Sequence, residues 1–255
     1  MPTPKYAPLG TFCWPELATT DLVAAKAFYG RLLGWTFEDV PTAMGNYTLF
    51  QLEGVDVAAG YQMGPQQTTA PRWNNYLQVA SADASHAKAL ELGATSLAAP
   101  YDIPNVGRMA FIQDPGGAPL LFWQSGTNRG AGIFDRPGAL CWTELATPDG
   151  QGAAQFYGAL LGWRAETRTD VGMVYTEFFL GDAPVAGMYE RPGHAARWIP
   201  YFAVQDVDAM VQVAVDTGGT IGAGPKDIPQ VGRFALLHDA KGAAFAVIQL
   251  GVGTE

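Results

Sequence analysis

Hydrophobic positions along the chain follow two periods in turn, and the order of these periods predicts the elements. Residues 11–19 have the pattern of a strand, and Thr20-Asp21 then suits the cap of a helix. Apolar residues recur at helical spacing as far as Leu33, and Gly34 ends the helix. Strand-like stretches separated by Gly, Asp and Pro follow at 36–40, 47–52 and 57–61.

The same order of elements follows in the next stretch of the chain. We predict a strand at 75–80, a helix at 82–92 that ends at Gly93, and strands at 95–97, 108–112 and 119–124. The turn before the last strand, Asp114-Pro115-Gly116-Gly117, has strong turn chemistry. The predicted unit is therefore βαβββ, and it occurs twice in the first half of the chain.

The chain is also an internal duplication. Residues 10–35 and 138–163 are identical at 16 of 26 positions, and residues 100–124 and 225–249 are identical at 12 of 25. Between them lies a Gly-rich polar stretch that is typical of a linker. We therefore predict an α+β protein of four βαβββ modules in two tandem domains. The first domain spans 9–125, the linker spans 126–137 and the second domain spans 138–250.

Composition excludes some classes of function. Hydrophobic residues make up 48% of the chain and charged residues 15%, which supports a sizeable core, and the net charge is −9. Nucleic acids and anionic membrane surfaces require basic faces, so neither is an expected partner. The chain shows no signal-peptide pattern and no run of 18 apolar residues, and two cysteines make no disulfide framework. We expect a cytoplasmic monomer or homodimer.

Motif residues carry a resemblance to a known family. A strand is followed by Asp21, then by Phe28-Tyr29 and Leu32-Leu33-Gly34-Trp35, and later by the turn at 114–117. The second copy repeats the pattern from Asp149 to Trp163, with the turn changed to Asp-Ala-Lys-Gly. This resembles the vicinal oxygen chelate superfamily of glyoxalases, bleomycin-resistance proteins and extradiol dioxygenases. The Phe-Cys-Trp-x-Glu-Leu and Asp-Ile-Pro-x-Val-Gly-Arg segments resemble a two-domain actinobacterial subgroup described as glyoxalase-like or hydroxylase-like.

The resemblance implies glyoxalase/dioxygenase-like domains in which two modules form a cup-shaped mixed sheet, often around a divalent metal. The usual ligand positions, however, do not hold metal ligands here. Three histidines, His86, His194 and His238, have no metal-ligand spacing. We therefore expect no metal and no cofactor, with a divalent metal as the alternative. In the two copies the family's ligand positions hold Trp14 and Trp142, Asn74 and Ile199, Leu121 and Ala246, and, less firmly placed, Ala59 and Gly187.

Glu16 and Glu144 are the candidate catalytic residues. Residues two apart in a strand share a face, so Glu16 points the same way as Trp14, into the cup. Desolvation there raises the pKa of a carboxyl group and suits it to act as a general base or a hydrogen-bond acceptor. The competing interpretation is a structural ion pair between each glutamate and Arg108 or Arg233. Cys13 and Cys141 are expected on the opposite face, toward the helix.

A mixture of aromatic and polar side chains on the strands predicts a ligand site. Arg108 and Arg233 are candidate anchors for a ligand carboxylate or phosphate. The alternative is that they bridge Asp102 and Asp227. The other candidate ligand-binding residues are Trp14, Asn74, Tyr76, Gln78, Trp123, Trp142 and Tyr201.

The sequence thus favours a metal-independent protein that sequesters or transforms a planar or aromatic metabolite in an aromatic-lined cup. Two alternatives stay open, a metal-dependent lyase or dioxygenase of the superfamily and a non-catalytic scaffold whose cups are filled by side chains. Whether the protein is an enzyme (a lyase, isomerase or oxygenase) or a binder is also open. The first copy offers more hydrogen-bonding groups, so we expect it to be the functional cup.

Overall fold

The structure, a computed structural model, describes residues 3, 5–42, 45–169 and 174–251. The chain forms two mixed sheets of eight strands each, and two helices accompany each sheet. The first sheet contains β1 (Phe12–Thr19), β2 (Thr36–Thr42), β3 (Gly45–Leu52), β4 (Val55–Gln62), β5 (Arg72–Gln78), β6 (Thr95–Ile103), β7 (Gly107–Gln113) and β8 (Pro119–Ser125). The second contains β9 (Leu140–Thr147), β10 (Arg164–Arg168), β11 (Tyr175–Leu180), β12 (Ala183–Glu190), β13 (Arg197–Ala203), β14 (Thr220–Ile228), β15 (Gly232–His238) and β16 (Ala244–Leu250).

The helices begin and end where the capping signals lie. In α1 the side chain of Asp21 accepts a hydrogen bond from the Ala24 amide, and Gly34 ends the helix with a φ of 72°. Within the described ranges, no helix is long and apolar enough to cross a membrane. The helices are α1 (Leu22–Leu33), α2 (Ala82–Glu91), α3 (Gly150–Leu161) and α4 (Val207–Asp216).

Each sheet joins two consecutive modules. The strand order is β2-β3-β4-β1-β5-β8-β7-β6 in the first sheet and β10-β11-β12-β9-β13-β16-β15-β14 in the second. The first strands of the two modules, β1 with β5 and β9 with β13, pair antiparallel in the middle of each sheet. The predicted fold of four βαβββ modules in two tandem domains is confirmed, and so is the pairing of neighbouring modules within a domain.

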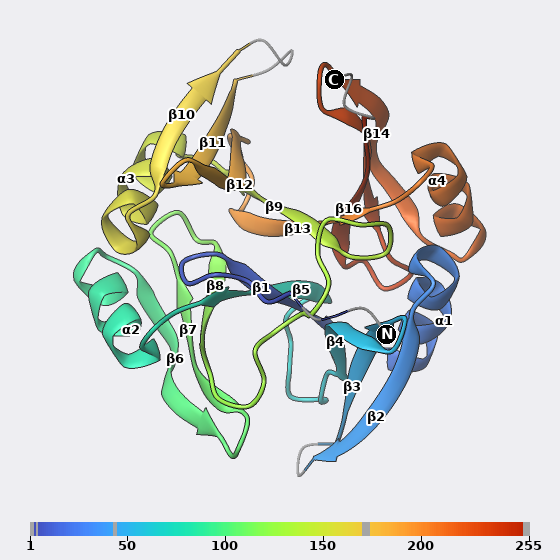
Figure 1. The fold of residues 1–255 in the computed structure, drawn as a ribbon, viewed down its shortest axis with the longest axis horizontal. Coiled ribbons are helices and arrows are strands. Elements are labelled where there is room, and N and C mark those ends of the chain that lie inside the picture. The colour runs from blue at the N-terminus through green and yellow to red at the C-terminus, as the bar shows by residue number, and fades with distance from the viewer. Residues whose placement is uncertain (1–2, 4, 43–44, 170–173, 252–255) are drawn as a thin grey trace.

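The two sheets lie back to back, with their concave faces pointing away from each other (Figure 1). Helix α1 packs beside α4 and α2 beside α3, so each helix pair contains one helix from each domain. The two large apolar clusters likewise mix the domains. One joins Phe28 and Trp35 to Phe202 and Phe245, and the other joins Ile112 to residues of the second domain. The domains therefore share their cores, and the concave faces lie outside this shared core.

Buried hydrogen bonds between the domains connect residues that also carry the family motif. In each direction, a helix tyrosine of one domain donates to the aspartate that opens the last turn of the other domain. A strand tryptophan in turn donates to the tyrosine hydroxyl. The bonds are Tyr157 Oη to Asp114 Oδ2 (2.7 Å), Trp198 Nε1 to Tyr157 Oη (2.9 Å), Tyr29 Oη to Asp239 Oδ2 (3.1 Å) and Trp73 Nε1 to Tyr29 Oη (3.0 Å).

Two local expectations from the sequence are wrong. The strand expected at 95–97 runs on to Ile103 despite Pro100, because β6 lies at the edge of its sheet, where a missing amide proton costs no ladder bond. Cys13 packs with the concave-face cluster that contains Trp14, and Cys141 packs against the corresponding cluster of the second domain. Irregular register at the start of β1 and β9 interrupts the alternation that would have turned both cysteines toward the helices.

Candidate active site in two concave faces

The first cup is the concave face of the first sheet, and its floor is aromatic. Trp14 on β1 is the register partner of Tyr76 on β5, which is in turn the partner of Leu121 on β8. Two residues further along β5 and β8, Gln78 pairs with Trp123. All five side chains are buried. The structure therefore brings together the first-copy aromatic and amide residues that the sequence singled out.

Glu16 lies at the centre of the first cup, surrounded by hydrogen-bond donors. Its register partner Asn74 donates from Nδ2 to Oε1 at 3.1 Å, while the hydroxyls of Tyr47 and Tyr76 donate to Oε2 at 2.9 and 3.1 Å. Trp14 Nε1 donates to the Tyr47 hydroxyl at 3.1 Å and so orients it. Burial raises the pKa of Glu16, and the three donors oppose that shift. The alternative of an ion pair with Arg108 is wrong.

The second cup repeats this centre with fewer donors. Tyr201 donates to Glu144 Oε2 at 2.6 Å, and Trp142 Nε1 donates to the Tyr175 hydroxyl at 3.0 Å, as Trp14 does to Tyr47. Ile199 is the register partner of Glu144 and cannot replace the amide of Asn74. Burial raises the pKa of Glu144 to about 7, against the effect of hydrogen bonds from Tyr201 and Tyr175.

Gly187 lies at the second cup's floor, where the first cup has Ala59. A Cβ atom at Gly187 would overlap the Tyr175 hydroxyl and lie 2.8 Å from Trp142 Nε1. Gly187 is also the register partner of Glu144. The arrangement of Trp142 and Tyr175 leaves space only for glycine as they stand, whereas the first cup accommodates Ala59 beside Trp14 and Tyr47.

Each cup also holds one buried polar atom without a partner. Within the described ranges, buried side-chain atoms without a hydrogen bond are Gln78 Oε1 in the first cup and Arg197 Nε in the second. Gln78 uses its amide nitrogen to donate to Ser125 Oγ at 2.5 Å, which leaves its oxygen free to accept. Buried polar groups in folded proteins are nearly always satisfied, so an orphan inside a concave face indicates a place for a ligand or a water molecule.

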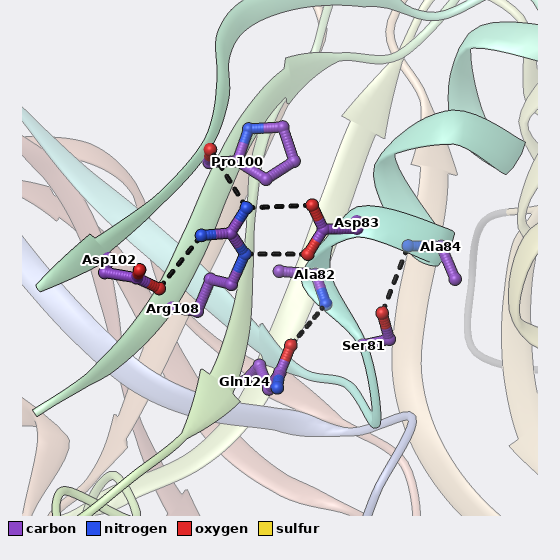
Figure 2. A network of polar contacts seen from close by, with 8 residues as sticks. All are labelled: Ser81, Ala82, Asp83, Ala84, Pro100, Asp102, Arg108 and Gln124. Carbon is purple, nitrogen blue, oxygen red and sulfur yellow. Dashed lines mark hydrogen bonds and ion pairs between the residues drawn. The ribbon is translucent and has the colours of Figure 1, made fainter.

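Arg108 and Arg233 lie outside the cups. Arg108 donates from Nε and Nη2 to Asp83 on α2 at 2.7 and 2.8 Å, and from Nη1 to Asp102 at 2.9 Å (Figure 2). Arg233 repeats the pattern with Asp208 and Asp227. The ion pair between Arg108 and Asp102, which was the alternative to a ligand-binding role, is present. Asp83 is a second carboxylate partner of the same guanidinium group. The geometry gives no support to either arginine as a ligand anchor.

The arginine bridges suggest a simple check. Arg108→Gln should leave ligand binding in the first cup unchanged, because the guanidinium group is held by exposed carboxylates away from Glu16. Titration of the variant with a ligand of the first cup measures this. A clear loss of affinity with an unaltered fold would restore Arg108 as an anchor.

The donor set does not fit the divalent metal that the family implies. The groups that point at Glu16 are two phenol hydroxyls and an amide nitrogen, and all three donate hydrogen bonds to the carboxylate. Metal ions bind through lone pairs, so these contacts compete with a metal for the same oxygen atoms. Among the described residues there is no group of three or more His, Cys, Asp or Glu able to hold a metal ion. Of the three histidines, His86 lies on α2, where its Nε2 atom forms a hydrogen bond with Ser96 Oγ at 2.8 Å.

Two surface hollows lie at the margins of the cups. One, of about 600 Å³, follows the hairpin between β6 and β7, where Ile103 and Val106 also contact the first cup's cluster. The other, of about 780 Å³, lies between the N-terminal segment, the linker and the start of β9, and it reaches Cys141 and Trp142. In the first domain the linker covers the corresponding end of the sheet. The amide of Ala131, in the linker, donates to the Cys13 carbonyl on β1 at 2.8 Å.

Sequence reasoning missed Tyr47 and Tyr175, the hydroxyls beside the two carboxyl groups. Both lie at the same place in the duplicated pattern, 128 residues apart, on strands that were predicted without a role. Their recurrence is a signal that could have drawn attention to them. Asp83 and Asp208, the helix partners of Arg108 and Arg233, recur in the same way.

Comparison with known families agrees with this architecture. Residues 139–247 match the Glyoxalase/Bleomycin resistance protein/Dioxygenase superfamily, and residues 11–52 match the Bleomycin resistance protein-like N-terminal family. The chain is 40% identical over 247 residues to the "Putative glyoxylase CFP32" of Mycobacterium tuberculosis (strain CDC 1551 / Oshkosh), which covers 94% of this chain and 95% of that protein. The chain belongs to the glyoxalase/bleomycin resistance/dioxygenase superfamily. It is also 36% identical to the anthracycline biosynthesis protein DnrV of Streptomyces peucetius, over 98% of this chain and 96% of that protein.

Solved structures of the superfamily share the fold. The 2,3-dioxygenase LapB from Pseudomonas sp. KL28 superposes with a TM-score of 0.67 over 96% of this chain and 94% of its own, at 13% identity. The Mn(II)-bound glyoxalase from Novosphingobium aromaticivorans gives a TM-score of 0.62 over 94% and 82% of the two chains, at 19% identity. At such low identity the likeness establishes the tandem fold and nothing about the chemistry.

Proposed function

We propose that each cup is a metal-independent site for a planar, aromatic small molecule, with Glu16 or Glu144 as its buried acid–base group. The observation that carries the proposal is the carboxyl group at the centre of each concave face, held by tyrosine hydroxyls in both copies. A group whose pKa lies near 7, like that of Glu144, can give or take a proton at neutral pH. A ligand hydroxyl beside it would exchange that proton.

The surroundings of the carboxyl group support an aromatic ligand with hydrogen-bonding substituents. Trp14, Tyr76 and Trp123 offer ring faces in the first cup, and the free Gln78 oxygen can accept a hydrogen bond from a ligand hydroxyl or amide. The similarity to an anthracycline biosynthesis protein points the same way, because anthracyclines contain planar fused rings that carry hydroxyl groups.

A scaffold without a ligand is the second candidate. The observation in its favour is the burial of the first cup's aromatic side chains, since Trp14, Tyr76 and Trp123 are each only 6% exposed. On this reading the side chains fill the cup themselves. The metal-dependent alternative is weaker, because the groups around Glu16 donate hydrogen bonds to the same carboxylate oxygens that a metal ion would bind.

The test is binding of a hydroxyanthraquinone, followed through the visible absorbance of the probe. We expect saturable binding that excess chelator leaves unchanged. Glu16→Gln or Trp14→Phe should weaken binding in the first cup by roughly tenfold, because each change removes a charge-assisted hydrogen bond or a ring contact. Glu144→Gln and Trp142→Phe report on the second cup in the same way.

The matched control is Arg108→Gln, which removes a repeated polar residue from outside the cup. Elemental analysis of protein purified without tag or chelator should find well under one transition metal per chain. Near-stoichiometric zinc, iron, nickel or manganese would support the metal-dependent alternative instead. Absence of binding to the probe and to a panel of hydroxylated aromatic compounds, in a folded protein, would favour the scaffold.

A further inference from the structure

Two arginine side chains and a histidine lie together at one end of the second cup. Ala146 on β9 is the register partner of both Tyr189 on β12 and Arg197 on β13, so these two flank it on one face. Arg191 follows β12 two residues after Tyr189, and His238 ends β15. Burial lowers the pKa of His238, and the positive charges of Arg197 and Arg191 lower that pKa further. The neighbouring Asp239 carboxyl group opposes this lowering of the pKa.

Arg197 has a buried donor with nothing to receive its hydrogen bond. Within the part of the chain that the structure describes, its Nε atom has no hydrogen-bond partner. The duplicate residue in the first domain, Arg72, donates from Nε to Asn74 Oδ1 at 3.1 Å and from Nη1 to Thr69 Oγ1 at 2.6 Å. Ile199 stands at the Asn74 position in the second domain. The second copy has therefore kept the arginine and lost its acceptor.

Two further differences between the copies lie at the same place, and one of them adds a positive charge. Arg191 occupies the position of Met63, and His238 occupies that of Gln113. No ion pair of Arg191 occurs within residues 3, 5–42, 45–169 and 174–251. In a chain of net charge −9, the two guanidinium groups of Arg191 and Arg197 create a local positive potential that favours an anion. A guanidinium fork offers the geometry that a carboxylate or phosphate needs.

We propose that the second cup takes a ligand that carries a compact anionic group, a carboxylate or a phosphate, which Arg197 and Arg191 hold. The ring of such a ligand lies over Tyr189 and points toward Glu144. The two cups then differ in specificity. The first cup pairs its own arginine internally and takes a neutral ligand, and the second selects an anionic one. This inference rests on the proposed function only for the statement that a ligand fills the cup.

The test is calorimetric titration with three probes that share a phenyl ring, namely benzoate, phenyl phosphate and benzamide. We expect one of the two anionic probes to bind at least about tenfold more tightly than the uncharged benzamide, a difference in line with a charge-assisted hydrogen bond. Arg197→Gln should abolish that preference, and the matched variant Arg72→Gln should keep it. The comparison of benzoate with phenyl phosphate shows which anion the site takes.

Two additional variants keep the test decisive if Arg197→Gln does not fold. Ile199→Asn supplies Arg197 with the acceptor that Arg72 has, and it should weaken anion binding by several-fold. Arg191→Gln changes a half-buried residue outside the strands and should also weaken it. Equal binding of benzoate, phenyl phosphate and benzamide, or equal losses in Arg72→Gln and Arg197→Gln, would overturn the inference. Anion binding that depends on Arg197, in a protein that binds no hydroxyanthraquinone, would support the anion site and count against the proposed function.

Discussion

Replacing Glu144 with glutamine should make the protein more stable at pH 8, by up to about 3 kcal/mol. The carboxyl group is buried, and burial raises its pKa from the ordinary value of 4.5, which applies to the unfolded chain, to about 7 in the folded protein. Each unit of such a shift corresponds to about 1.4 kcal/mol. Between pH 4.5 and 7 the folded state holds a proton that the unfolded state releases, so stability falls as the pH rises through this window. Glutamine keeps the shape and has no charge to bury.

Urea unfolding of the native protein and of Glu144→Gln at pH 5 and at pH 8 measures the effect. Near pH 5 Glu144 is protonated in the folded protein, so the two proteins should differ much less in their free energies of unfolding than at pH 8. Glu91→Gln, the same change at an exposed position of α2, serves as the control. A variant that is less stable than the native protein at both pH values would show that the charge is better compensated than its contacts indicate.

Much of the fold was predictable because the duplication gives each signal twice. Asp21 and Gly34 bound the first helix, and Asp149 and Gly162 bound its duplicate in the same way. The direction of Glu16 was also predictable, since strict alternation holds between Trp14 and Glu16. It fails at Cys13, where the register of the strand pair shifts. An extra residue in a strand leaves no reliable trace in the hydrophobic pattern.

The partners of the candidate site residues could not be predicted from the pattern. Glu16 is held by Tyr47 and Tyr76, which lie 31 and 60 residues further along the chain. Strand order decides which of several tyrosines faces the carboxyl group, and periodicity is silent on strand order. One partner of Arg108 was unpredictable for the same reason. Its guanidinium group donates to Asp83, which lies at the start of a helix that packs on the sheet.

The contacts between the domains could not be predicted from the sequence for a different reason. In the sequence, Tyr29 and Asp114 and their duplicates stand out only as motif residues within each copy. In the structure, the two tyrosines reach across to an aspartate of the other domain. A repeat predicts which residues are equivalent, but it cannot tell whether a side chain bonds within its own copy or with the other one. The back-to-back arrangement of the sheets decides this.

Tyr157→Phe should therefore lower the free energy of unfolding by on the order of 3 kcal/mol, although it removes a single oxygen atom. The tyrosine hydroxyl donates to Asp114 Oδ2 at 2.7 Å and accepts from Trp198 Nε1 at 2.9 Å, and all three side chains are buried. Its loss leaves one buried acceptor and one buried donor unsatisfied, each at a cost of about 1–3 kcal/mol. Tyr29→Phe tests the reciprocal bond with Asp239.

The dependence on pH distinguishes the lost hydrogen bond from disturbed packing. Burial raises the pKa of Asp114, and the hydrogen bond from Tyr157 opposes that shift. Without the hydroxyl group, the ionised carboxylate loses more stabilisation than the protonated acid does. The destabilisation should therefore be larger at neutral pH than in acid, where Asp114 takes up a proton in the folded protein. Tyr101→Phe, at an exposed position of β6, is the control. An equal loss of stability at all pH values would assign the effect to packing and not to the bond between the domains.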